Sequence, residues 1–278
     1  MTIHVARSAG FCFGVKRAVR LALETAHKHA APVYMLGEIV HNEHVVQELA
    51  AAGVRVVADL AEIAAGTLII RAHGATPDVF AAARAKGLTI VDASCPFVLE
   101  IHALVRQLAE EGYTLVVIGD HGHDEVLGIA GQVAGATILA SPAEAAAMPR
   151  AARIGVVVQS TQNIENVQQI VALLAAQCRE LKFFNTICAP TTQHQRDIRA
   201  LPQTCEVMII IGSRNSANTC RLTAIARALN PRTYHVESAA EVQPAWFAGV
   251  ASVGISAGAS TPEVIIQAVL QRIRALQN

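Results

Sequence analysis

Three of the six cysteines lie in polar or glycine-rich loops, where a thiolate could bind a metal ion or an iron–sulfur cluster. They are Cys12 in Gly10-Phe-Cys-Phe-Gly14, Cys95 in Ser94-Cys-Pro-Phe97 and Cys188 in Ile187-Cys-Ala-Pro190. Each precedes a predicted helix, and the backbone N–H groups at a helix N-terminus stabilise a thiolate or an anionic cluster. Compact CxxC pairs are absent, so the spacing predicts a metal site without naming the metal.

The other three cysteines are predicted to pack against apolar neighbours. Cys178 continues the apolar stripe of Val167, Ile170 and Leu174, so it is placed on an amphipathic helix. Cys205 opens an apolar strand, and Cys220 lies on a helix that follows a polar loop. Free cysteine is among the most buried residue types, so we expect these three to be packing residues rather than ligands.

Polar loops follow several predicted strands, and in open α/β sheets ligands bind at the carboxyl ends of the strands. These loops are Val40-His-Asn-Glu43, Ala72-His-Gly-Ala75, Gly119-Asp-His-Gly-His-Asp-Glu125, Gln159-Ser-Thr161, Gly212-Ser-Arg-Asn-Ser-Ala-Asn218 and Gly258-Ala-Ser260. Serine, asparagine, histidine and helix-start N–H groups can bind phosphate without a cluster of lysines. The alternative is local: His41 and His73 could cap loops, and Ser216 and Asn218 could cap the next helix.

Glu125 is the strongest candidate for acid–base chemistry. It lies two residues after His123 in a glycine-flanked loop, where it could donate a proton if its surroundings keep it protonated. The alternative interpretation is an acid on a surface loop, which is the commoner place for glutamate.

The elements that would position these residues alternate between β-branched apolar runs and longer segments of helical period, which is typical of parallel sheets with crossover helices. Strands are predicted near Ile3–Ala6, Val33–Leu36, Thr67–Arg71, Thr114–Ile118, Arg153–Val158, Glu206–Ile211, Thr233–Val236 and Ala251–Ile255. Thr76, Ser141 and Thr261 each precede a proline, so each is predicted to cap a helix. Ser141 with Glu144 predicts a capping box.

The chain of 278 residues, 53% of them hydrophobic, can bury a large core. The three loop cysteines are 83 and 93 residues apart, which gives one cysteine to each lobe-sized segment. We therefore predict the α/β class, with three small α/β lobes around a common centre.

Charge and hydropathy exclude several classes of protein. With 22 basic and 22 acidic residues the net charge is zero. The sequence has no run of like charges of the kind that would predict nucleic-acid binding. The N-terminal residues lack the apolar region of a signal peptide, and the longest apolar runs have the length of a strand. We expect a cytoplasmic protein without a membrane partner, whose cysteines serve as ligands or packing residues rather than in disulfides.

Taken together, these motifs resemble the LytB family, the reductases of 4-hydroxy-3-methylbut-2-enyl diphosphate. The resemblance runs from Gly10-Phe-Cys-Phe-Gly-Val15 to Ala257-Gly-Ala-Ser-Thr-Pro262, through Val40-His-Asn42, Ala72-His-Gly74, Asp92-Ala-Ser-Cys-Pro96, Gly122-His-Asp-Glu-Val126, Gln159-Ser-Thr161, Ile187-Cys188 and Gly212-Ser-Arg-Asn-Ser216. It implies a pseudo-threefold trefoil around a central [4Fe–4S] cluster held by Cys12, Cys95 and Cys188. The implied lobes are residues 14–95, residues 96–187, and residues 188–278 together with 1–13.

The resemblance also implies the reaction and the roles of the site residues. The expected reaction is reductive dehydroxylation of the (E)-substrate to isopentenyl and dimethylallyl diphosphate, the last step of the non-mevalonate isoprenoid pathway. The substrate hydroxyl would bind the open iron, Glu125 would donate a proton, and reduced ferredoxin or flavodoxin would supply electrons. Substrate-binding positions are His41, His73, His123, Ser160, Thr161, Ser216, Asn218 and Ser260.

The chain departs from the family pattern at three positions. Ala217 stands where many relatives carry a second serine, Ser160 replaces a frequent threonine, and Asp124 replaces a frequent proline. These changes predict weaker diphosphate affinity with catalysis retained. Two alternatives are a quinolinate-synthase-like cluster enzyme, which the His-Asn and His-Gly motifs argue against, and a catalytically silent cluster-binding redox sensor.

Overall fold

The computed structural model describes residues 1–28 and 32–276. Residues 29–31, and residues 277–278 at the end of the predicted third lobe, lie outside the described residues. The chain forms two compact units: the first comprises Met1–Lys16, Val40–Val46 and Ala189–Asn278, and the second comprises Arg17–Ile39 and Gln47–Cys188. In the described residues, no helix has both the length and the apolar character needed to cross a membrane.

The second unit contains two parallel sheets. The strands of the first are β2 (Val33–Leu36), β3 (Val54–Val57), β4 (Thr67–Ile70) and β5 (Thr89–Asp92), in the order β3-β2-β4-β5. The helices that precede or connect these strands along the chain are α1 (Phe13–Lys28), α2 (Glu43–Ala51), the 3-10 turn η1 (Leu60–Glu62) and α3 (Pro77–Ala85). All four residues of β4 are buried, as expected for a central strand of a parallel sheet that is covered on both faces.

The second sheet of this unit has the order β7-β6-β8-β9. Its strands are β6 (Thr114–Ile118), β7 (Thr137–Leu139), β8 (Ala151–Val158) and β9 (Cys178–Phe183), and its helices are α4 (Pro96–Glu110), α5 (Asp124–Ala130), α6 (Pro142–Ala147) and α7 (Ile164–Ala175). Val156 and Val158 of β8 pack with α7, whereas Val157 packs with α4 and α5. Alternate residues of one strand thus bury opposite faces of the sheet.

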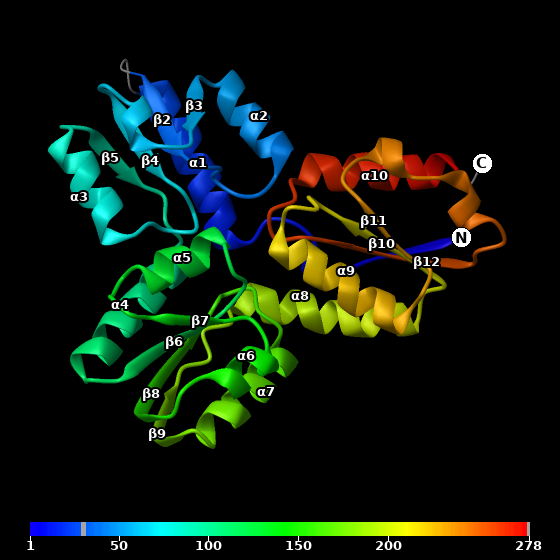
Figure 1. Cartoon of the computed structure of the whole chain (residues 1–278). Coiled ribbons are helices and arrows are strands. Elements are labelled where there is room, and N and C mark those ends of the chain that lie inside the picture. Colours follow the sequence, from blue (N-terminus) through cyan, green and yellow to red (C-terminus); the bar gives the residue numbers. More distant parts are fainter. Residues whose placement is uncertain (29–31, 277–278) are drawn as a thin grey trace. The chain divides into compact units, whose positions relative to one another are not determined.

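The first unit contains the third parallel sheet, in the order β1-β12-β10-β11 (Figure 1). Its elements are β1 (Thr2–Val5), α8 (Ala189–Ala200), η2 (Leu201–Gln203), β10 (Val207–Ile211), α9 (Ala217–Leu229), β11 (Thr233–Val236), η3 (Ala239–Glu241), η4 (Pro244–Phe247), β12 (Ser252–Ala257) and α10 (Glu263–Ala275). Ile209 packs with α10 on one face, and Ile210 packs with α8 and α9 on the other. Figure 1 shows these helices on opposite sides of the strands.

The same strand order recurs in all three sheets. The strands β2, β6 and β10 are central, and the next strand along the chain lies beside each of them at an edge. The strands β4, β8 and β12 are the second central strands, and their outer neighbours β5, β9 and β1 lead to Cys95, Cys188 and Cys12. The predicted α/β class with three lobes is confirmed, and each lobe is a four-stranded parallel sheet with its own helices.

All eight predicted strands are present within two residues at either end. Among the described residues, the strands that were not predicted from the sequence are β3, β5, β7 and β9, which all lie at sheet edges. The prediction that Cys178 extends a helix is wrong, because α7 ends at Ala175 and Cys178 opens β9. The sulfur still packs against a core cluster.

Two further local predictions are wrong. Thr261 does not cap a helix: its hydroxyl donates to the carbonyl of Ile211, and Pro262 is the N-cap of α10. Cys220 lies on α9 as predicted but is exposed rather than packed, and its thiol donates to the carbonyl of Arg214. Ser141 caps α6 as predicted, accepting from the backbone N–H of Glu144.

Candidate active site

Each of the three loop cysteines directly precedes a helix, as the sequence predicts. Cys12 precedes α1, Cys95 is the N-cap of α4, and Cys188 precedes α8. All three are partly buried, and no cysteine in the described residues forms a disulfide. The N–H of Val15 in the first turn of α1 donates to Sγ of Cys12 over 3.5 Å. The N-terminus of α1 therefore places an N–H group beside the sulfur of Cys12, an arrangement that would stabilise a thiolate.

The backbone of each cysteine is held by a polar loop. Each cysteine N–H donates to the carbonyl two residues past a central strand: Cys12 to Ala259 over 3.2 Å, Cys95 to Ala72 over 2.9 Å, and Cys188 to Ser160 over 3.0 Å. The carbonyls belong to the predicted substrate-binding loops, either to Ser160 itself or to the residue before His73 or Ser260. In all three cases, one hydrogen bond thus joins a candidate cluster ligand to the loop of a candidate substrate contact.

The loop before Cys12 is also fixed by α8, within the first unit. Asp197 accepts from the backbone N–H and the hydroxyl of Ser8, over 3.1 and 2.8 Å. The ring of His194, which is only 1% exposed, bonds the carbonyl of Ser8. Burial lowers the pKa of His194 below its ordinary value. These contacts hold the approach to Cys12 in one conformation.

A buried polar cluster lies at the carboxyl ends of β10 and β12. Ser216 is the N-cap of α9, and the hydroxyl of Ser260 donates to that of Ser216 over 3.4 Å. Asn218 is 4% exposed, yet neither its amide nitrogen nor its amide oxygen has a hydrogen-bond partner among the described residues. An unsatisfied buried amide is costly. The cluster thus offers donors and an acceptor to a ligand.

Glycines bring backbone close to this cluster. A Cβ at Gly258 would lie 2.0 Å from the hydroxyl oxygen of Thr219, and a Cβ at Gly212, whose φ is +145°, would lie 2.5 Å from that of Thr261. Only glycine fits at such approaches. Thr219 was not predicted from the sequence as a site residue; it is fully buried, and its hydroxyl has no hydrogen-bond partner among the described residues. Its position directly after Asn218 was the available signal.

The one arginine in this loop is bound elsewhere. The guanidinium of Arg214 bonds the carboxylates of Glu237 and Glu241, and the backbone N–H of Arg214 also donates to Glu237, over 2.7 Å. The hydrogen bond from Arg214 lowers the pKa of Glu241 and is the largest contribution to that shift. The Ser216 cluster therefore presents hydroxyl, amide and backbone groups rather than the guanidinium of Arg214.

Glu125 is in the first turn of α5 rather than in a loop, and it is only 3% exposed. The alternative of a surface acid is therefore wrong. His123 is the N-cap of α5, and its Nδ1 accepts from the backbone N–H of Glu125 over 3.1 Å. A neutral imidazole that accepts at Nδ1 carries its proton on Nε2.

Ser160 holds the carboxylate of Glu125 with two hydrogen bonds. Its backbone N–H donates to Oε1 over 2.6 Å, and its hydroxyl donates to Oε2 over 2.8 Å. Since the carbonyl of Ser160 accepts from Cys188, one residue joins the acid to a candidate cluster ligand. Thr161, the next residue, is partly buried and accepts from the side chain of Gln159 over 3.1 Å.

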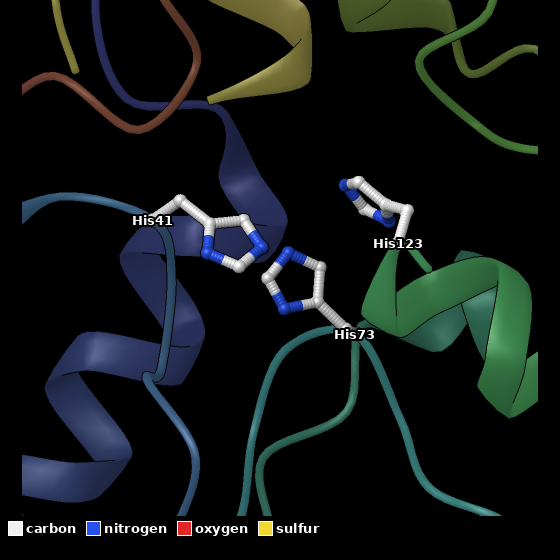
Figure 2. A group of neighbouring side chains, drawn as sticks. All are labelled: His41, His73 and His123. Atoms are coloured by element: carbon white, nitrogen blue, oxygen red, sulfur yellow. The ribbon is translucent and has the colours of Figure 1, made fainter. Parts of the chain in front are cut away.

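His73 and His123 lie against each other within the second unit. Their ring centroids are 5.4 Å apart and their planes are perpendicular (Figure 2). His102 lies beside the His73 loop: it is 3% exposed, and its ring would lie 2.8 Å from a Cβ at Gly74. Burial, with a smaller contribution from Arg106, lowers the pKa of His102 to about 4. A neutral, packed imidazole thus supports the His73 loop.

His41 belongs to Val40–Val46, the short segment of the first unit that follows β2. It is partly buried. The neighbouring Asn42 is 7% exposed, and its side-chain oxygen accepts from the N–H of Val45 over 3.3 Å at the start of α2.

Comparison with known proteins decides the family. A family model described as LytB protein matches residues 3–274. The chain belongs to the LytB family. Among curated LytB relatives, the 4-hydroxy-3-methylbut-2-enyl diphosphate reductase of Geobacter metallireducens is 45% identical over 100% of this chain and 99% of its own length. The reductase of the same name from Aquifex aeolicus is 43% identical over 99% of this chain and 96% of its own.

Two solved structures of similar proteins agree with this family. One is described as (E)-4-hydroxy-3-methyl-but-2-enyl diphosphate reductase, the terminal enzyme of the non-mevalonate pathway. It is 43% identical with a TM-score of 0.72, covering 99% of this chain and 100% of its own. The other is the E-1-hydroxy-2-methyl-but-2-enyl-4-diphosphate reductase of Plasmodium falciparum, 26% identical with a TM-score of 0.92, covering 100% and 88%. The predicted resemblance to LytB reductases and the predicted oxidoreductase class are confirmed.

The fold brings together candidate site residues that the sequence could identify only one at a time. Within one unit it brings Ser216 to Ser260, and within the other it brings Ser160 to Glu125. The strand-end carbonyls that hold the cysteines were not predicted, because every residue has a backbone carbonyl and its residue type does not show what that carbonyl binds.

Proposed function

We propose that this chain removes the allylic hydroxyl of (E)-4-hydroxy-3-methylbut-2-enyl diphosphate as water, forming isopentenyl and dimethylallyl diphosphate in the last step of the non-mevalonate pathway. The reaction consumes two electrons and two protons: the C–O bond breaks, a C–H bond forms, and water leaves. The full-length similarity to reductases of this name supports the assignment.

We propose that Cys12, Cys95 and Cys188 hold a [4Fe–4S] cluster. The donor set fits such a cluster, since thiolates are its usual ligands and each of these cysteines precedes a helix. When bound, the cluster would supply electrons and, at an iron that no cysteine holds, a Lewis acid. Two of the three remaining cysteines fit the role less well: Cys205 is buried in a core cluster, and Cys178 opens an edge strand.

The observation that carries the proposal is the chain of contacts from Glu125 through Ser160 to Cys188. A hydroxyl is a poor leaving group, so its departure needs a proton from a fixed acid close to the reducing group. Glu125 is buried and doubly held, which fixes its direction. After it donates, the two hydrogen bonds from Ser160 would stabilise the carboxylate that remains. His123 accepts a hydrogen bond from the backbone N–H of Glu125, and we propose that it lines the same pocket.

The diphosphate would bind Ser216, Asn218 and Ser260 together with His41 and His73, as the resemblance implies. Support comes from the unpartnered amide of Asn218, because a phosphate oxygen would accept from its nitrogen and remove the cost of burying it. The N-terminus of α9 adds N–H groups and the positive end of a helix dipole. Binding through the non-reacting diphosphate would hold the hydroxyl in place for the reaction. Thr161 is proposed to lie near that hydroxyl.

We further propose that the reaction takes place in the cytoplasm with a small one-electron donor such as reduced ferredoxin or flavodoxin. Single electrons must arrive twice for each turnover, which suits a protein carrier of low potential. We also propose that the three lobes are residues 14–95, residues 96–187, and residues 188–278 with 1–13.

The test begins with anaerobic purification and reconstitution with iron and sulfide, followed by an assay of the hydroxymethylbutenyl diphosphate with a low-potential donor. We expect turnover that is lost in Glu125→Gln with the cluster spectrum intact. The matched control is Glu144→Gln, which removes the same charge from the first turn of another helix in the same lobe and should keep turnover.

Two results would overturn the proposal. A well-formed cluster without turnover in the wild-type protein would favour the redox-sensor alternative. Stoichiometric zinc without a brown chromophore would exclude the cluster itself.

A further inference from the structure

An ion pair joins the His73 loop to the helix that carries Glu125, within the second unit. Nη1 of Arg71 lies 2.5 Å from Oδ2 of Asp124, and the two side chains are 21% and 24% exposed. Arg71 follows β4 and lies two residues before His73, whereas Asp124 is the first residue of α5, between His123 and Glu125. The pair therefore links two lobes at the positions where they present their candidate substrate contacts.

The path of the arginine is fixed by a glycine. A Cβ at Gly37, just after β2, would lie 2.3 Å from Nη1 of Arg71, and Gly37 has a φ of +71°. The guanidinium of Arg71 thus packs directly on the backbone of Gly37 where it bonds Asp124. Any other residue at position 37 would be strained and would displace the arginine.

Close contacts, not charges, hold the other end of α5. A Cβ at Gly131 would lie 2.4 Å from Cγ2 of Thr76, and the side chain of Gln132 donates to the carbonyl of Ala75 over 3.2 Å. Between the two ends, residues including Leu127 and Gly128 line a cavity of about 90 Å³ that Arg71 and Asp124 also border. The cavity leaves the first turn of α5 less closely packed here, and the Arg71–Asp124 ion pair is a charged contact from this turn to the His73 loop.

We propose that Arg71 and Asp124 are positioning residues, which fix the first turn of α5 so that Glu125 and His123 keep a set relation to His73. This inference rests on the proposed function. The pair touches no reacting atom and acts through Glu125. Its loss should lower kcat much more than it raises KM. A misplaced acid donates its proton less well, whereas among the proposed diphosphate contacts only His73 adjoins the pair, and Ser216, Asn218 and Ser260 belong to the other unit.

The two partners are not equivalent, and this gives the proposal a sharper form. Without Arg71, the carboxylate of Asp124 still lies at the N-terminus of α5, where the helix dipole favours a negative charge. Without Asp124, the partly buried guanidinium of Arg71 faces the positive end of the same dipole with no carboxylate to offset it. Asp124→Ala should therefore be more damaging than Arg71→Ala, and removing both should be less damaging than removing Asp124 alone.

The experiment compares the holoenzymes of the wild type, Arg71→Ala, Asp124→Ala and the double variant. We expect kcat to fall about 3-fold in Arg71→Ala and about 10- to 100-fold in Asp124→Ala, with the double variant close to Arg71→Ala and KM within about 2-fold throughout. The matched control is the pair Lys182 and Glu111, also salt-bridged at 2.6 Å within the second unit, whose alanine variants should keep kcat. If an alanine variant loses its cluster spectrum, Arg71→Lys and Asp124→Asn carry the same comparison, with Arg71→Lys restoring most of kcat.

The outcomes separate the inference from the function on which it rests. An active wild type whose Asp124 variants keep kcat, or lose activity only through KM, would overturn the positioning role alone. Losses that multiply in the double variant would overturn the coupling between the two residues. A wild type with an intact cluster and no turnover would overturn the proposed function and the inference with it.

Discussion

Asn218→Ala should weaken substrate binding without destabilising the fold, which is the opposite of what burial alone predicts. The residue is 4% exposed in the first two turns of α9, and both polar atoms of its amide lack a partner among the described residues. Each unsatisfied buried polar group costs about 1–3 kcal/mol. Alanine removes that cost and is a better helix former. The small cavity that the substitution leaves offsets part of this gain in stability.

The net effect on unfolding should lie between no change and about 2 kcal/mol of added stability. Substrate binding, in contrast, should become weaker. A hydrogen bond to a charged group contributes about 1.5–3 kcal/mol, so KM for the diphosphate substrate should rise about 10- to 100-fold. Urea unfolding of the apoprotein gives the first quantity, and steady-state kinetics of the anaerobic holoenzyme give the second.

Asn230 provides the matched control at the other end of α9. It is also buried, but its amide donates to the carbonyl of Cys205 over 2.8 Å and accepts from the N–H of Arg232 over 2.9 Å. Asn230→Ala should therefore cost about 1–3 kcal/mol of stability and leave KM unchanged. The reasoning would be refuted if Asn218→Ala lost stability as Asn230→Ala does while KM stayed at the wild-type value.

Three further predictions use contacts elsewhere in the chain. Ser160→Ala removes the 2.8 Å hydrogen bond to Glu125 and should lower kcat about 10-fold, whereas Ser160→Thr keeps the hydroxyl and should keep kcat; equal rates in both variants would contradict this. Cys188→Ser should abolish the cluster absorption and Cys178→Ser should preserve it, which anaerobic visible spectra would decide. Because burial lowers the pKa of His102 from 6.5 to about 4, the unfolded chain takes up a proton first as the pH falls through this range. The resulting loss of stability, about 2 kcal/mol at pH 5, should be absent in His102→Gln when urea unfolding is compared at pH 7 and pH 5.

Central strands could be predicted from the sequence, and edge strands largely could not. Val207–Ile211 is buried at every position, so its sequence is a continuous apolar run, and such a run predicts a buried strand. Val54–Val57 and Cys178–Phe183 lie at sheet edges and expose two or more residues each, so their apolar pattern is broken. The same weakness explains the error at Cys178, because the period of α7 could be continued across the turn that ends it.

The candidate site shows a similar division. Residue types and their order were enough to name Cys12, Glu125 and the polar loops, because thiolates, carboxyls and helix-start hydroxyls carry their chemistry with them. The burial of Glu125 was not foreseen, since a glycine-flanked His-Asp-Glu segment reads as an exposed loop. The unpartnered amide of Asn218 was equally hidden, because hydrogen-bond satisfaction depends on neighbours that are distant in sequence.

The sequence by itself determined the α/β class, the position of each candidate cluster ligand before a helix, and the LytB resemblance, because these depend on local period and on the order of motifs. Only the tertiary structure decided which residues act on one another. Ser160 meets Glu125 across 35 positions, and Arg71 meets Asp124 across 53. Such contacts form where parallel strands deliver separate loops to one edge of a sheet, and that convergence is set by the packing of whole lobes.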